Sequence, residues 1–88
     1  MNTSTKSPYQ IRTAQELYDF ELGKTSEPKS NEFKQGVMDC LKYRTKESQF
    51  PIIQYKEATC QFDAWKAGIE AGHYIYNTEL ERKRLHDN

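Results

Sequence analysis

The chain has 88 residues, enough for a single domain, and a folded chain of this size buries only about 60% of the surface that its unfolded form exposes. Apolar residues make up 35% of the sequence and charged residues 30%, while Lys plus Arg and Asp plus Glu both total 13. Because the charges balance, the chain as a whole lacks the positive excess that is typical of a nucleic-acid binder and the negative excess that is typical of a DNA mimic.

The N-terminal residues are polar. No apolar run reaches the length of a membrane span, and Met1 opens a segment without the charged-then-apolar order of a secretory signal. We therefore expect a soluble, cytoplasmic protein with no membrane partner. Residues 1–10 are rich in Ser, Thr and Asn and predict a flexible N-terminal tail, followed by a single domain over residues 11–86.

The first helix is predicted to begin at Thr13. Thr13 and Glu16 have the spacing of a capping box, and Gly23 provides the stop. The large apolar residues between them fall on one side at helical spacing, whereas Phe20 points away from that side. These residues predict a short helix that packs on the rest of the domain.

A second helix is predicted from about Ser30 to Tyr43. Pro28 opposes helix in the connection before it, and Ser30 can cap its start. Apolar residues repeat at three and four residues, which predicts one buried stripe; its members are Phe33, Val37, Cys40 and Leu41. The other side is expected to face water; it carries Lys34, Asp39 and Lys42. Gly36 within this helix indicates that another backbone passes close by.

Residues 50–55 are a short apolar run whose structure the sequence leaves open. Pro51 favours an extended conformation at Phe50. The run fits a plug over the end of a helical bundle, an isolated strand, or the start of the next helix with Pro51 in its first turn. A lone strand has no partner to pair with, so we favour the plug or the helix start.

The longest predicted helix runs from about Glu57 to Leu80. Its main apolar row spans about 80° of arc and consists of Ala58, Phe62, Trp65, Ile69, Gly72 and Tyr76, with Leu80 continuing it. A second, smaller row adjoins it, at Ala64, Gly68, Ala71 and Ile75, and Cys60, Ala67 and Tyr74 widen the uncharged surface further. The polar strip is narrow and consists of Asp63, Lys66, Glu70, His73 and Asn77. So wide an apolar circumference must be covered on more than one side.

Three interpretations of this wide face are open. It can be buried within one chain, it can bind a second copy of the chain, or it can bind another protein. Trp65 fits the centre of the core, His73 fits a solvent-facing position, and Tyr74 fits an interface anchor. For the last two interpretations, the predicted partner-binding residues are Ala64, Ala67, Ala71, Tyr74 and Ile75.

Positive charge is locally concentrated in two places. One group is Lys42, Arg44 and Lys46, and the other is Arg82, Lys83 and Arg84 in a stretch that can extend the last helix. Each group has acidic neighbours, which favours a solvated face, although both could touch a phosphate or an acidic partner. Cations near a helix C-terminus also interact favourably with its dipole.

Cysteine and histidine do not form a recognisable catalytic or metal-binding motif. Cys40, Cys60, His73 and His86 are scattered singly, whereas a zinc site needs about four ligands in close pairs. Both cysteines are expected to be reduced, buried and small apolar residues. We therefore expect no metal, no cofactor, no small-molecule substrate and no enzymatic activity.

One family resemblance rests on short motifs. The sequence has Phe33-Lys-Gln-Gly36, then Pro51, then Trp65-Lys-Ala-Gly68, an order that resembles the ribosome modulation factor family over residues 33–72. The resemblance implies a two-helix hairpin with Gly36 and Gly68 in close helix packing, Trp65 in the core, and ribosome binding. The chain departs from the family in its neutral charge, its extra N-terminal helix and its longer connector.

We therefore expect an all-α fold, either a small bundle or a hairpin of two main amphipathic helices plus a short N-terminal helix. The expected function is a non-enzymatic, protein-binding regulator or inhibitor that acts sterically through the last helix, with homo-oligomerisation as an open possibility. Its size and character are similar to those of small host-directed bacteriophage proteins. The alternative function is a ribosome- or RNA-associated protein similar to the modulation factors.

Overall fold

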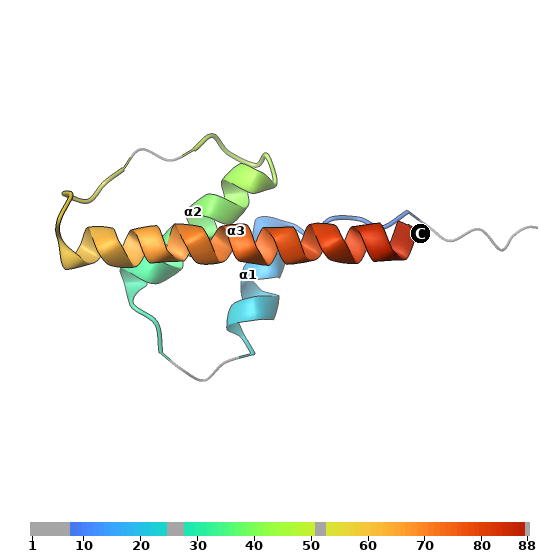
Figure 1. The fold of residues 1–88 in the computed structure, drawn as a ribbon, viewed down its shortest axis with the longest axis horizontal. Coiled ribbons are helices and arrows are strands. Elements are labelled where there is room, and N and C mark those ends of the chain that lie inside the picture. The colour runs from blue at the N-terminus through green and yellow to red at the C-terminus, as the bar shows by residue number, and fades with distance from the viewer. Residues whose placement is uncertain (1–7, 25–27, 51–52, 88) are drawn as a thin grey trace, which may run out of the picture.

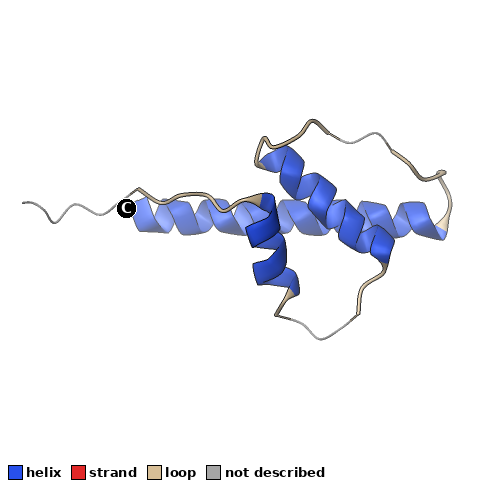
Figure 2. Cartoon of the chain, turned by 180° about the vertical axis from the view of Figure 1, so that it is seen from behind, coloured by secondary structure: helices blue, strands red, loops and turns tan. Residues whose placement is uncertain are grey.

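The computed structural model describes residues 8–24, 28–50 and 53–87, which form three α-helices and no strand. The helices are α1 (Ala14–Leu22), α2 (Asn31–Arg44) and α3 (Cys60–Asp87). Helix α3 has 28 residues and is about 42 Å long. Helices α1 and α2 both cross it on one side (Figures 1 and 2). The expected all-α fold of two main helices and a short N-terminal helix is confirmed.

Helix α1 begins with the predicted capping box. The Thr13 hydroxyl accepts the Glu16 N–H at 3.1 Å, and the Glu16 carboxylate accepts the Thr13 N–H at 2.9 Å. A second carboxylate lies at the same end, because Glu47 accepts the Ala14 N–H at 2.8 Å. Negative charge at a helix N-terminus is favourable, so Glu47 fixes the loop after α2 to the start of α1.

Helix α2 is capped by Ser30, whose hydroxyl accepts the Phe33 N–H at 3.1 Å. The helix ends at Arg44, one residue beyond the predicted end, and Lys46 then takes a left-handed conformation with φ of 65°. The loop closes back on the helix, since the Glu47 and Ser48 N–H groups both donate to the Lys42 carbonyl. Glu47 therefore reaches α1 from a loop with its own hydrogen bonds.

Helices α2 and α3 touch backbone to backbone at Gly36 and Gly68. A Cβ atom at Gly36 would lie 2.1 Å from the Trp65 carbonyl oxygen, and one at Gly68 would lie 2.1 Å from the Phe33 carbonyl oxygen. Only glycine leaves room for this crossing. The prediction that another backbone passes close to Gly36 is confirmed.

The core lies between α3 and the two shorter helices and has two clusters. One comprises Ala14, Leu17, Val37, Leu41 and Ile75, and the other comprises Cys40, Trp65 and Ile69. Trp65 is only 4% exposed, which confirms its predicted place in the core. Its indole N–H donates to the Asp39 carboxylate at 2.9 Å. Asp39 was expected to face water only; it is half-buried because a buried indole N–H needs an acceptor.

The predicted start and end of the last helix are wrong by several residues. Ala58 has φ of 65°, and the Thr59 hydroxyl accepts the Phe62 N–H at 3.1 Å, so α3 begins at Cys60. The helix continues past Leu80 to Asp87. Leu80 was expected on the buried row but is 40% exposed, because the preceding residue, Glu79, occupies the buried position.

The connector before α3 contains no helix in its described part. Residues 53–59 are irregular, so the interpretation of the apolar run as a helix start is wrong for them, while Pro51 and Ile52 lie outside the described residues. Phe50 packs edge-on against Tyr43 with 5.1 Å between ring centroids, and Tyr55 packs against Trp65 at 6.4 Å. Of Phe50 and Tyr55, it is Tyr55 that packs against the core, in the cluster that contains Trp65.

The predicted N-terminal tail is partly structured. Residues 1–7 lie outside the described residues, but the Tyr9 hydroxyl donates to Glu79 at 2.8 Å and the Tyr9 ring lies 5.5 Å from that of His86. The segment runs beside the C-terminal part of α3 (Figure 1). The boundary at residue 10 is therefore wrong, because Tyr9 belongs to the folded part.

Candidate functional site

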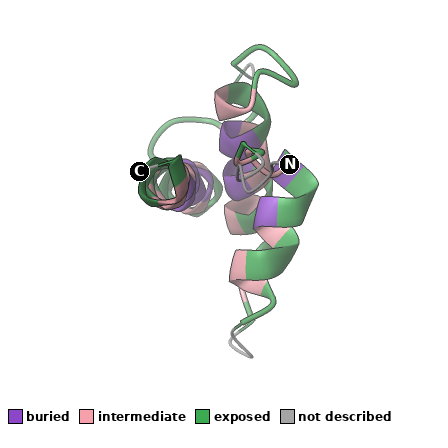
Figure 3. Ribbon diagram, turned by 90° about the vertical axis from the view of Figure 1, so that its right-hand side faces the viewer, coloured by how far each residue is buried: buried purple, intermediate pink, exposed green. Residues whose placement is uncertain are grey.

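One side of α3 carries a row of exposed or half-buried uncharged residues at the edge of the surface that α1 and α2 cover. We call this row the outer face; its members are Cys60, Ala64, Ala67, Ala71, Tyr74, Thr78 and Leu85. Helices α1 and α2 both lie on the opposite side of α3, where the buried residues gather (Figure 3). Tyr74 is 74% exposed and Leu85 is 60% exposed. The outer face is therefore available to a partner.

Four of the five predicted partner-binding residues lie on the outer face. Ala67 and Tyr74 are exposed, while Ala64 and Ala71 are half-buried at the edge where α3 meets the core. Ile75 was also predicted to bind a partner but is only 6% exposed, because it packs in the cluster that contains Leu17 of α1. Ile75 is thus a core residue.

Sequence analysis missed two members of the outer face, Thr78 and Leu85. Leu85 lies beyond the predicted end of the helix, yet it continues the row seven residues after Thr78. The signal was that Ala71, Thr78 and Leu85 follow one another at intervals of seven residues, which places all three on one side of a helix. Glu81 interrupts the row between Thr78 and Leu85.

One border of the outer face carries free negative charge. Asp63 and Glu70 are exposed, and within the described part of the chain neither side chain has an ion pair. Further along the same border, Arg84 pairs with Glu81 on its own helix. His73 was expected to face solvent but is half-buried, because its Nδ1 lies 2.7 Å from the Arg44 guanidinium.

The first predicted basic group is not a continuous patch. The Arg44 guanidinium is held by His73, by the Asn77 side-chain oxygen at 2.8 Å, and over the Tyr76 ring at 4.7 Å from its centroid. The Lys42 and Lys46 side chains are exposed.

A cavity of about 330 Å³ beside Arg44 and Lys46 is also lined by Glu47. The Thr45 hydroxyl and the Ala14 N–H donate to the Glu47 carboxylate and lower its pKa. An incoming phosphate would therefore meet a negative charge in this cavity.

The second basic group is neutralised by neighbouring carboxylates. Arg82 lies 3.3 Å from Glu21 and 3.3 Å from Glu79. The other two members pair with acidic residues on their own helix, Lys83 with Asp87 and Arg84 with Glu81. Each of the three cations therefore has a carboxylate partner, and the group has little net charge to offer to RNA.

A buried carboxylate that the sequence analysis did not single out fixes the N-terminal segment. Glu79 is fully buried and accepts hydrogen bonds from the Tyr9 hydroxyl at 2.8 Å and the Arg12 N–H at 3.1 Å. The Arg12 guanidinium lies 3.6 Å away, and burial together with the Glu79 carboxylate raises the pKa of Tyr9. Glu79 follows Trp65, Ile69, Gly72 and Tyr76 at the same three- and four-residue spacing, which was the signal for its burial.

The two cysteines have different environments. Cys40 is buried, and desolvation raises the pKa of its thiol to about 11, whereas Cys60 is exposed at the first residue of α3. The expectation that both are buried is therefore wrong for Cys60. Both are free thiols. Among the described residues, no group of three or more His, Cys, Asp or Glu side chains is placed to hold a metal ion.

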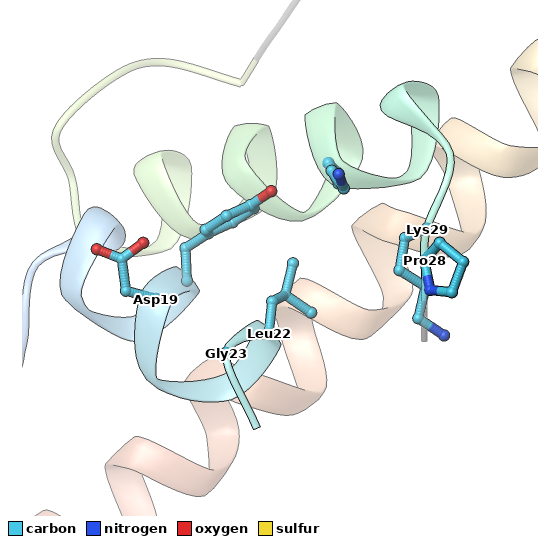
Figure 4. Close-up of a pocket in the computed structure, with 7 residues that line it drawn as sticks. Asp19, Leu22, Gly23, Pro28 and Lys29 are labelled. Atoms are coloured by element: carbon cyan, nitrogen blue, oxygen red, sulfur yellow. The ribbon is translucent and has the colours of Figure 1, made fainter. Parts of the chain in front are cut away.

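A shallow opening of about 350 Å³ lies between α1 and the segment that leads into α2 (Figure 4). Asp19, Leu22 and Gly23 line one wall, and Pro28 and Lys29 line the other. Residues 25–27, which join these two walls, lie outside the described residues. Because the segment that joins the two walls is not described, the opening does not indicate a class of ligand.

No protein-family model, curated protein or solved structure matches the chain. The resemblance to the ribosome modulation factor family stays a prediction. In the described part of the chain, every helix is too short or too polar to cross a bilayer.

Proposed function

We propose that this chain is a small, non-enzymatic protein-binding regulator or inhibitor that acts by steric occlusion through the outer face of α3. The single observation that carries the proposal is the outer face around Tyr74, an aromatic residue that is 74% exposed and follows the exposed Ala67 and the half-buried Ala64 and Ala71 along the helix. Contiguous uncharged surface on a small protein marks an interaction site, and aromatic residues supply much of the binding energy there.

The composition of the outer face favours a helix or another flat protein surface as the partner. Ala64, Ala67 and Ala71 allow a partner backbone to approach closely, and Tyr74 provides one large anchor beside them. Asp63 and Glu70 give the face a charged border, which favours partners with basic groups at the matching place.

The chemistry of the remaining groups supports a non-catalytic role. The buried Cys40 thiol, with its pKa raised to about 11, is a poor nucleophile at neutral pH. The Nδ1 atom of His73 is engaged with Arg44, so it is not placed as a general base for a nearby thiol.

Capture from an extract of the native host tests the proposal. Tagged full-length chain, Tyr74→Glu and Lys66→Gln are compared; the last is the matched control, because it changes the net charge by the same amount and Lys66 is exposed on the same helix outside the outer face. We expect the wild type and the control to retain the same protein and Tyr74→Glu to lose it, with all three equally helical by circular dichroism.

The dependence of binding on salt concentration distinguishes this function from the ribosomal alternative. An apolar contact barely responds to ionic strength, whereas RNA retention through Arg and Lys weakens steeply. Ribosomal RNA that is retained by all three proteins and is released by moderate salt would contradict the proposal.

A further inference from the structure

We infer that the outer face binds a second copy of this chain, with the two α3 helices antiparallel. The inference rests on the proposed function, since it names the partner of the same face. It is carried by two observations, the seven-residue spacing of the face and the charge along its border.

The outer face has the periodicity of a coiled coil. Cys60, Ala67 and Tyr74 are each seven residues apart, and a second row with the same spacing consists of Ala64, Ala71, Thr78 and Leu85. Two such rows, offset by three and four residues, form the contact seam of paired helices. Within the described part of the chain α1 and α2 lie on one side of α3 (Figure 3), so that Cys60, Ala67, Tyr74 and Leu85 stay exposed and only one edge of the seam, at Ala71, packs against the core.

The residues in the seam are complementary to themselves in the antiparallel orientation. Pairing Ala71 with Tyr74 of the second copy places the large side chain against a small one, and the same register places Cys60 beside Leu85 of the second copy. Glu81 then faces Ala64, whereas parallel helices would place the two Glu81 carboxylates against each other. Like charges directly opposite are destabilising.

The charges along the border favour the same orientation. Asp63, Glu70, Asn77 and Arg84 are also seven residues apart, so they line one border of the seam, with acid at one end and base at the other. In antiparallel helices this border meets its own copy, and Asp63 lies opposite Arg84. In parallel helices Asp63 and Glu70 would instead lie opposite Gly68 and Ile75 of the other copy, neither of which carries a charge.

Sedimentation equilibrium of the full chain is the first test. We expect the mass to rise from one chain toward two with concentration, Tyr74→Glu to remain a monomer, and Lys66→Gln to dimerise as the wild type does. Asp63→Arg and Arg84→Asp should each weaken the dimer by about threefold to tenfold, the scale of exposed ion pairs, and together they should restore it.

Disulfide formation determines the orientation. In the antiparallel pair the two Cys60 thiols lie about 38 Å apart along the helices, whereas Cys60 adjoins position 85 of the other copy. Mild oxidation should therefore link Leu85→Cys chains far faster than wild-type chains, and adding Tyr74→Glu should abolish the difference. Rapid linkage of wild-type chains through Cys60 would overturn the antiparallel arrangement.

A chain that stays monomeric at high concentration would overturn the second-copy inference. If that monomer still captures a host protein in a Tyr74-dependent way, the proposed function stands without it. If neither association depends on Tyr74, both are overturned.

Discussion

The crossing of α2 and α3 makes an unusual prediction about replacing Gly68 by alanine. In a helix, Gly→Ala normally stabilises by nearly 1 kcal/mol. Here the added Cβ atom would lie 2.1 Å from the Phe33 carbonyl oxygen, 2.9 Å from the Val37 nitrogen and 3.0 Å from the Gly36 Cα. These are backbone atoms that no rotamer change can move, so the helices must separate by about 1 Å to restore ordinary contact near 3.4 Å.

The cost of that separation exceeds the gain in helix propensity. Overpacking costs about 1–3 kcal/mol, and contact with a rigid backbone places Gly68→Ala at the upper end of this range. We therefore expect a net loss of about 2 kcal/mol in the free energy of unfolding. Ala67→Gly, at the exposed neighbouring position, should cost only about 1 kcal/mol through propensity.

Urea unfolding measures both variants. The fluorescence of Trp65, the single and buried tryptophan, reports on the crossing, and circular dichroism reports on the helices. Both are recorded at one low protein concentration, because association would add to apparent stability. A Gly68→Ala chain as stable as the wild type, or more stable, would refute the backbone crossing.

Two further predictions concern buried and capping carboxylates. Glu79→Ala leaves two guanidinium groups near a buried void and should cost about 2–3 kcal/mol, less than the loss of a fully buried pair, because both guanidinium groups reach solvent. In the same urea assay Glu81→Ala, at an exposed pair, should leave the free energy of unfolding almost unchanged. Equal effects would argue against the buried role of Glu79. The pKa of Glu47 is lowered in the folded chain, so its contribution to stability is present above the unfolded value near 4.3 and is lost as pH falls through the folded value. The stability difference between wild type and Glu47→Gln should therefore shrink on acidification, and a difference independent of pH would refute this.

Local signals in the sequence predicted the helices and their beginnings well. Thr13 and Ser30 cap α1 and α2 as expected, because a capping side chain reaches only two or three residues along the chain. Gly36 indicated a close backbone because glycine in a helix is otherwise unfavourable, and Trp65 lay at the centre of the apolar row. The start of α3 was missed because the left-handed turn at Ala58 has no local signature.

The candidate site could be predicted only in part. Periodicity placed Ala67 and Tyr74 on the exposed side, but it could not exclude Ile75, which lies at the edge of that side and is covered because α1 and α2 pack there. The same applies to Asp39 and His73, which sequence analysis placed in solvent; each is half-buried beside a residue of the other main helix.

The sequence alone determined that this chain forms three helices and which side of each helix is apolar, because both depend on residues within a few positions of one another. Tertiary structure alone decided how much of that apolar circumference is covered. Coverage depends on where two short helices and the segment before them lie on a third, and that placement is set by contacts such as Gly36 with Gly68 and Tyr9 with Glu79, between residues far apart in the chain.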